Sequence, residues 1–394
     1  MKKAKTDIPV VIVGGGPVGL FLAISLLKKG IKCRVLEKRK EPVPDSRSLG
    51  IHPVSLELFD ELGITEPFLR EGLIIKKGLA LTADKSLGEI SFEDCPPPHN
   101  YILACPQFTT EKILRKELYK LDNQALVLGA EFEFLNEMDD HIEVVYSTDE
   151  QASQRLRGAF LIGCDGKNSS VRQHASIHYS GKRYDDTYIM GDFEDTTDFG
   201  PDAAVFLLKN GLIECFPLPN GMRRWVVKTD HYHSDPTQLQ LAELVSNRIG
   251  YNLTNIKSTM LSSFGVQHFM AENFCKGRVV LAGDAAHVVS PIGGQGMNLG
   301  WLDCKELATS LEDITNYRGA KSSEYAFQKL LSYSKKQRKI ASKVAKRAEI
   351  NMALGRKSNF PFLRNVFIKG MLHSPFKTKV AELFTMRGLS SWWI

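Results

Sequence analysis

Residues 8–19 read Ile-Pro-Val-Val-Ile-Val-Gly-Gly-Gly-Pro-Val-Gly, and this stretch decides the fold class. Its first half is a short β-branched apolar run, which is typical of a strand buried on both faces. Gly14, Gly16 and Gly19 then match the G-x-G-x-x-G pattern of a dinucleotide-binding turn. The first glycine permits the tight turn, the second admits a pyrophosphate, and the third lets the next helix pack closely on the strand. The stretch therefore predicts a β–α–β unit that binds a dinucleotide.

An acidic residue narrows the choice of nucleotide. The helix that follows the turn ends at Gly30, and a second strand over 32–36 ends at Glu37. At this distance from the glycine turn, a carboxylate binds ribose hydroxyls. It also argues against a 2′-phosphate, so the unit favours FAD or NAD over NADP. The expected cofactor contacts of this unit are Gly14, Gly16, Pro17, Val18, Gly19, Glu37 and Lys38.

Two later segments also place a polar turn directly after a buried strand. We call residues 10–19 the first segment, 161–172 the second and 277–298 the third. The second runs from an apolar strand into Asp165-Gly166, with Ser169 placed to cap a helix. The third runs from an apolar strand into Gly283-Asp284, where a carboxylate is well placed to bind ribose or ribityl hydroxyls. A glycine-rich turn then opens a helix at about residue 296, whose free amides favour negative charge.

In this order and spacing, the three segments resemble the single-component FAD-dependent aromatic hydroxylases, the p-hydroxybenzoate hydroxylase-like family. The resemblance covers about residues 8–335. It implies that Asp284 contacts the ribityl region of FAD, and that Asp165 belongs to a motif serving the FAD pyrophosphate and the nicotinamide nucleotide. It also implies that the helix start at Gly296, Met297 and Asn298 faces the flavin N1–C2 carbonyl edge. Cys304 departs from the family, which usually has alanine there.

Two single residues gain a role from the resemblance. Arg47 matches an arginine that reaches over FAD, and a guanidinium suits phosphate oxygens because its fork offers two donors. Gln107 matches a residue that touches FAD from the start of a helix over 110–118. The alternatives are a solvated surface arginine and a polar residue that only begins a helix. For His52 and His287 we favour structural roles, because flavin hydroxylation does not demand a histidine.

Composition limits the remaining possibilities. A chain of 394 residues holds two domains, and no apolar run reaches the length of a membrane span. Residues 1–5 lack an apolar signal core, and the seven cysteines are scattered without a C-x-x-C pair. This favours the reducing cytoplasm and argues against a disulfide framework or a metal site. The net charge of +6 is concentrated in a predicted helix over 335–347, which we interpret as a solvent-exposed helix face. No sequence motif supports nucleic-acid binding.

The expected fold class is α/β, with an interrupted Rossmann-type FAD-binding domain, an antiparallel-sheet substrate domain and a helical C-terminal tail. Residues 1–75, 106–184 and 266–335 form the FAD-binding domain, 76–105 and 185–265 the substrate domain, and 336–394 the tail. A hairpin turn is expected at 219–222, from its Asn-Gly pair. The aromatic-rich tail is expected to pack on the FAD-binding domain, with peripheral membrane contact as the weaker alternative.

The resemblance implies a function. The chain would be an FAD-dependent monooxygenase that hydroxylates an aromatic or enolic small molecule with NAD(P)H and dioxygen, through a flavin C4a-hydroperoxide. No residue pattern fixes a catalytic acid or base. The alternatives are a flavin-dependent reductase or halogenase, or a non-catalytic FAD-bound small-molecule-binding protein. The W-x-W-x-I-P motif usual in halogenases is absent, since the close tryptophan pair is Trp392-Trp393. The sequence leaves open the substrate, NADH against NADPH, and monomer against homodimer.

Overall fold

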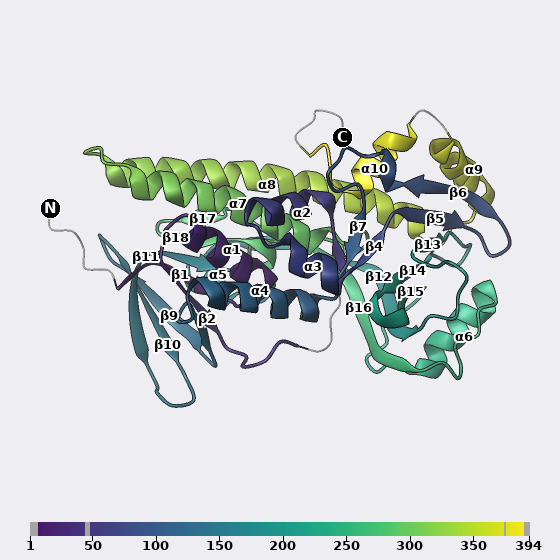
Figure 1. Cartoon of the computed structure of the whole chain (residues 1–394), viewed down its shortest axis with the longest axis horizontal. Coiled ribbons are helices and arrows are strands. Elements are labelled where there is room, and N and C mark those ends of the chain that lie inside the picture. The colour runs from purple at the N-terminus through teal and green to yellow at the C-terminus, as the bar shows by residue number, and fades with distance from the viewer. Residues whose placement is uncertain (1–6, 44–47, 374–375, 390–394) are drawn as a thin grey trace.

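A mostly parallel sheet forms the larger half of the molecule (Figure 1). The computed structural model describes residues 7–43, 48–373 and 376–389. The main strand order is β17 (Cys275–Lys276), β18 (Val279–Leu281), β11 (Gln154–Gly163), β1 (Ile8–Val13), β2 (Cys33–Glu37) and β8 (Leu126–Leu128). A hairpin of β9 (Glu131–Glu137) and β10 (Ile142–Ser147) extends from β11. The central strand β1 lies between β11 and β2, both parallel to it, which explains its unbroken apolar sequence.

Helices cover this sheet, and α1, α5 and α7 begin directly after polar or glycine-rich turns. Helix α1 (Pro17–Lys28) follows β1 directly and packs against α4 (Gln107–Leu121) and α7 (Gln295–Asn316). Shorter helices α2 (Pro53–Glu61), α3 (Thr65–Glu71) and α5 (Ser170–His174) complete the layer. The strands and helices expected around the three segments are therefore confirmed, with ends shifted by a few residues.

A second sheet of eight strands forms the smaller half. Its order is β19 (His287–Val288), β16 (Ser258–Ala271), β12 (Tyr179–Glu194), β15 (Met222–Thr229), β14 (Ile213–Leu218), β13 (Ala203–Phe206), β5 (Lys77–Leu81) and β6 (Ser86–Ser91). Neighbours pair antiparallel except β13 and β5, which are parallel where the two inserted stretches meet. The predicted hairpin at 219–222 is confirmed, and Asn220 takes the left-handed conformation with φ of 63°.

Two long strands join the halves. Strand β12 continues across residue 184 and β16 across residue 265, the positions at which the sequence suggested domain borders. Helix α6 (Gln238–Ile249) packs against one face of the second sheet, against β12 and β15. A small sheet of β3 (Gly50–Ile51), β7 (Ile102–Ala104) and β4 (Leu73–Ile75) lies beside β14.

The C-terminal part is divided between the two halves. Helix α8 (Ser322–Gly355) runs unbroken through residue 335 beside α7, and reaches the second sheet where Leu212 donates to the carbonyl of Gly355 at 2.9 Å. Helices α9 (Pro361–Leu372) and α10 (Lys377–Phe384) pack on β6, and α10 also on the short helix η1 (Phe92–Asp94). The expectation that the tail packs on the FAD-binding domain therefore holds for α8. Helices α9 and α10 pack mainly on β6 of the predicted substrate domain, and Ala381 of α10 also joins an apolar cluster with Ile75 of the predicted FAD-binding domain.

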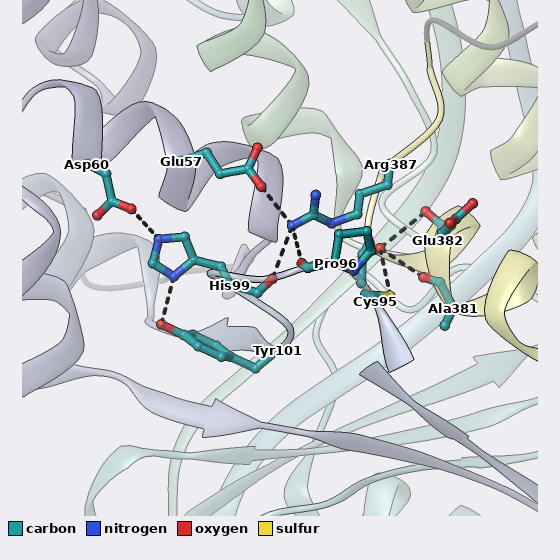
Figure 2. Close-up of polar contacts among 10 residues, drawn as sticks. Glu57, Asp60, Cys95, Pro96, His99, Tyr101, Ala381, Glu382 and Arg387 are labelled. Carbon is teal, nitrogen blue, oxygen red and sulfur yellow. Dashed lines mark hydrogen bonds and ion pairs between the residues drawn. The ribbon is translucent and has the colours of Figure 1, made fainter. Parts of the chain in front are cut away.

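The segment after α10 contacts helix α2 and the loop before β7, both from the N-terminal third of the chain (Figure 2). Arg387 pairs with Glu57 of α2 at 2.7 Å and donates to the carbonyls of Pro96 and His99. His99 in turn pairs with Asp60 of α2 at 2.5 Å. These contacts fasten the tail to the loop over 95–101 and to α2. Over the part of the chain described here, no helix is both long and apolar enough to cross a membrane.

Candidate cofactor-binding site

The strand ends that precede the polar turns meet at one edge of the parallel sheet. Val13 of β1 is paired with Gly163 of β11 and Leu36 of β2, and Gly163 is paired with Leu281 of β18. Because these strands are parallel, the residues that follow them lie side by side. The structure thus brings the first, second and third segments together at the carboxyl edge, where open α/β sheets bind ligands.

Each glycine of the first segment has a distinct environment. Gly14 has φ of +104°, and a Cβ there would lie 2.4 Å from the carbonyl oxygen of Cys164. A Cβ on Gly19 would lie 1.9 Å from the carbonyl oxygen of Gly14, so helix and strand touch at this point. A Cβ on Gly16 would meet no atom within 4 Å in the described part of the chain. The open space at Gly16, at the N-terminus of α1, is the cradle that a pyrophosphate needs.

Glu37 is fixed beside this turn. Its carboxylate accepts the N–H of Gly15 at 2.6 Å and the Nε of Arg39 at 2.9 Å, and the residue is 3% exposed. One oxygen is therefore committed to the turn and the other to Arg39, an arginine that the sequence analysis did not single out. Lys38 is exposed next to it. The ribose contact expected of Glu37 remains a prediction.

The second segment combines a helix cap with a link to the third. Asp165 Oδ2 accepts the N–H of Val171 at 3.1 Å and so caps α5, together with Ser169. Its Oδ1 is buried without a hydrogen-bond partner among the described residues, and burial raises the pKa of the carboxyl. Arg172 donates to the carbonyl of Ala285 at 2.8 Å and stacks on the ring of Tyr179 at 3.7 Å. Arg172 thereby joins the two segments.

Asp284 lies at this edge, directly after strand β18. The residue is exposed, and desolvation by the surrounding protein raises the pKa of its carboxyl, offset in part by His287 and Lys167. Its carboxylate makes no hydrogen bond to any residue that the structure describes. A ligand with hydroxyl groups would supply the missing donors.

A buried ion pair supports the turn that carries Asp284. His287 Nε2 lies 2.6 Å from Asp303 Oδ2, which also accepts the N–H of Gly283 at 2.9 Å. Both side chains are fully buried. Burial alone would lower the pKa of His287, but the adjacent carboxylate outweighs this and raises it. This geometry agrees with the structural role expected for His287, which holds Asp303 against the turn. The sequence did not identify Asp303 as its partner.

The N-terminus of α7 faces the same edge. Gly294 caps it with φ of 64°, so the N–H groups of Gly296 and Met297 belong to the first turn, where helical partners are lacking. Asn298 is fully buried, and its side chain accepts from the N–H of His52 at 2.9 Å and donates to the carbonyl of Gly50. Its amide is thus engaged in holding the segment before α2. His52 is buried too, which lowers its pKa to about 4.

Helix α7 also packs closely on the first turn of α1. Trp301 Nε1 donates to the carbonyl of Pro17 at 3.1 Å, and the Cys304 thiol donates to that of Val18 at 3.3 Å. A Cβ on Gly300 would lie 2.5 Å from the side chain of Val18. The contact of Cys304 gives a physical role to the residue that departs from the family's usual alanine.

Two predicted contacts stand apart. Gln107 begins α4, and its side-chain amide donates to Glu111 at 2.9 Å, a buried carboxylate whose other oxygen has no partner within the described residues. Gln107 is also tied through its backbone to Ser48 at 3.0 Å. Arg47 lies outside the described residues, so its predicted contact has no structural account.

Comparisons with known proteins agree with this geometry. A family model described as "FAD binding domain" matches residues 7–348. The chain belongs to this family. The predicted resemblance is thereby confirmed, and the open cradle at Gly16 fits FAD as its cofactor.

Similar proteins are named as monooxygenases. Rifampicin monooxygenase of Streptomyces venezuelae is 32% identical over 77% of this chain and 63% of its own length. An uncharacterized aromatic compound monooxygenase of Bacillus subtilis (strain 168) is 31% identical over 76% of this chain and 60% of its own length. The chain therefore spans about three fifths of these two relatives. Among solved structures, anhydrotetracycline hydroxylase from Streptomyces rimosus aligns with a TM-score of 0.78, 28% identity, and coverage of 96% of this chain and 76% of that one.

Proposed function

We propose that the protein is an FAD-dependent monooxygenase that hydroxylates an aromatic or enolic small molecule with NAD(P)H and dioxygen. The observation that carries the proposal is the sheet edge where the open space at Gly16 lies together with Asp284, whose carboxylate has no hydrogen-bond partner among the described residues. This edge adjoins the second sheet, because Ile292, in the turn before α7, belongs to an apolar cluster with Tyr188 and Met190 of β12. The monooxygenase names of the similar proteins support the reaction type. The scattered cysteines favour the cytoplasm as its location.

The proposal assigns a role to each part of the edge. Gly16 and the start of α1 would receive the pyrophosphate, Glu37 the adenosine ribose, and Asp284 the ribityl hydroxyls. The first-turn amides of Gly296 and Met297 would face the flavin carbonyl edge, where they stabilise negative charge. The remaining proposed contacts are Gly14, Pro17, Val18, Gly19, Lys38, Arg47, Gln107, Asp165 and Asn298.

Bound FAD, once reduced by NAD(P)H, supplies the reaction with dioxygen and the delivery of one oxygen atom to the substrate carbon. The chain's own contribution is to orient the substrate and keep water away. The apolar cluster of the second sheet gives a dry wall beside the turn at Ile292, which limits side reactions with solvent.

The test has two parts. The purified protein is expected to be yellow, with one FAD per chain released intact by acid, since no covalent anchoring motif is present. With an aromatic substrate under labelled dioxygen, the product should gain one labelled oxygen atom. Extraction of FMN would contradict the cofactor assignment, and a product without oxygen from dioxygen would favour a reductase or halogenase. A protein that keeps FAD but never oxidises NAD(P)H would be a binding protein.

A further inference from the structure

One face of the second sheet looks toward the cofactor edge, and we call it the inner face. Alternate residues of β12 point to it, including Tyr188 and Met190, while Ile189 points to the opposite cluster beneath α6. Helix α8 reaches the same face through Met352, and the turn before α7 reaches it through Ile292. The inner face of the second sheet is therefore the face that adjoins the proposed cofactor edge.

Glu214 is a carboxyl group on this apolar face. Its neighbours Ile213 and Cys215 belong to the opposite cluster, so Glu214 points to the inner face. In register, Glu214 lies opposite Val226 of β15, and Val226 lies opposite Met190 of β12. The residue is 8% exposed and has no hydrogen bond or ion pair with any residue described in the structure. Burial alone raises the pKa of its carboxyl to about 7.

Tyr188 adds a second polar group to the same face. Its ring stacks on Phe264 with centroids 5.2 Å apart, and the residue is fully buried. The hydroxyl has no hydrogen-bond partner among the described residues. Burial raises the pKa of Tyr188, and the charge of Glu214 raises it further, which places the two groups within electrostatic reach. Buried polar groups normally have hydrogen-bond partners. The Glu214 carboxyl and the Tyr188 hydroxyl have none among the described residues, which makes this face a candidate ligand site.

The other charged groups on this face are already paired. On one side, Arg224 contacts Asp192 through two bonds of 2.7 and 2.8 Å. On the other side, Asp186 pairs with Lys228 at 2.9 Å and with Arg356 at 2.5 Å. Both cations diagonal to Glu214 across β15 are thus committed to aspartates. Neither a neutralising partner for Glu214 nor an uncommitted cation for a carboxylate ligand lies here in the described part of the chain.

We propose that Glu214, with Tyr188, binds a hydroxyl or amino group on the ring of the substrate, and that the substrate class is a ring with such a donor and without a carboxylate beside it. The inference rests on the proposed function and specifies its substrate. For a phenol or enol, the O–H bond breaks, its proton passes to the Glu214 carboxylate, and the electron pair stays on oxygen. The ring carbons ortho and para to that oxygen become more electron-rich, as an electrophilic oxygen transfer requires.

The test compares matched ligands by titration of the flavin absorbance of the FAD-loaded protein. The probes are mono-, bi- and tricyclic aromatics, each as the hydroxyl compound, its methyl ether and its carboxylate. The wild type should bind the best hydroxyl compound at least about tenfold more tightly than its ether, which corresponds to about 1.4 kcal/mol. Glu214→Leu, which suits an apolar face, should reduce this preference to less than about twofold. The control is Glu143→Gln, a buried carboxyl of β10 paired with Arg155, which should leave the preference intact.

A second variant separates a chemical role from packing. In Glu214→Gln, the ionisation near pH 7 expected in the wild-type profile of substrate-stimulated NAD(P)H oxidation should disappear while FAD is retained. Retained hydroxyl preference in Glu214→Leu, tighter binding of carboxylates, or no binding of any hydroxyl compound would overturn the assignment. If the wild type shows the preference but never oxygenates a ligand, the proposed function fails and this site stands. If oxygenation occurs and the variants behave as wild type, the function stands and this site fails.

Discussion

Two aspartates at the same sheet edge are expected to respond differently to removal. The Asp284 carboxylate has no hydrogen-bond partner among the described residues, so Asp284→Ala should cost mainly a hydrogen bond to FAD, about 1.5–3 kcal/mol, or roughly ten- to a hundredfold in affinity. Asp165 caps α5, so Asp165→Ala should lose less FAD and instead slow flavin reduction by NAD(P)H, with a stability loss of about 1 kcal/mol. Flavin retention after dialysis and stopped-flow reduction measure both. Equal flavin loss with normal reduction in both variants would contradict this division.

The buried His287–Asp303 pair predicts a pH-dependent stability. The folded pKa of His287 is raised above its ordinary value of 6.5. The pair therefore stabilises fully below pH 6.5, and its contribution is lost as pH rises through the folded pKa. We expect His287→Asn to destabilise by about 3–5 kcal/mol at pH 6 and by less at pH 9, measured by thermal unfolding. A difference from wild type that grows with pH would refute this.

His52 offers the opposite sign as a control. Its folded pKa is lowered to about 4, so the neutral ring is favoured and stability falls as pH drops below 6.5. His52→Asn should remove that decline and approach or exceed wild-type stability as pH falls, unlike His287→Asn.

At the residue level, the sequence could predict carboxylates that follow strands, because strand ends and glycine patterns are local signals. Glu37 and Asp284 are examples. It could not predict the contacts of Asp303 or Arg172, since their partners are His287, 16 residues away, and Ala285, 113 residues away. Such pairs depend on how helices and strands pack, and nothing in the local pattern marks them. The burial of the Glu214 carboxyl could not be predicted for the same reason, because in the sequence Glu214 is a single polar residue within an otherwise apolar strand.

At the element scale, the glycine turn after β1 separates folding from binding. A Cβ on Gly19 would lie 1.9 Å from a backbone oxygen, so Gly19→Ala should destabilise by about 1–3 kcal/mol or more. A Cβ on Gly16 meets no atom of the described residues within 4 Å, so Gly16→Ala should fold normally. It should still weaken FAD binding at least about tenfold, because the methyl group takes the space of the pyrophosphate. Circular dichroism melts of the apoproteins and FAD titrations distinguish the two. If Gly16→Ala bound FAD with wild-type affinity, the pyrophosphate would not bind at Gly16.

Element identity was more predictable than element extent. The β–α–β units and the hairpin at 219–222 follow from hydrophobic runs and turn residues. Strands β12 and β16 extend beyond the predicted borders because they pair with each other from Tyr179 to Phe193 across both halves. The parallel pairing of β13 with β5 and the packing of α9 and α10 on β6 are long-range choices. They depend on contacts between segments that are far apart in the sequence, and a short window of sequence does not reveal such contacts.

At the scale of the whole molecule, the proposed function requires the nicotinamide nucleotide and the substrate to reach the same bound flavin. The chain has a single G-x-G-x-x-G turn, so the nicotinamide nucleotide and the substrate would both approach the flavin from a shared opening. The inner face, α8 and the turn at Ile292 meet in one apolar cluster. Substrate on the inner face would thus change the surroundings of the flavin, and a modest difference in affinity between two flavin positions is enough to shift their populations.

We therefore expect a fitting substrate to accelerate NAD(P)H oxidation by at least about tenfold, which is about 1.4 kcal/mol of barrier. Without substrate, slow reduction limits the loss of electrons to peroxide. The measurement is NAD(P)H consumption under air with and without ring compounds, alongside peroxide and product. A ring compound that fills the site but cannot be hydroxylated should stimulate consumption and yield peroxide alone, which serves as the control. Equal rates with and without a converted substrate would show that reduction is not gated, and that the two reagents reach the flavin by separate routes.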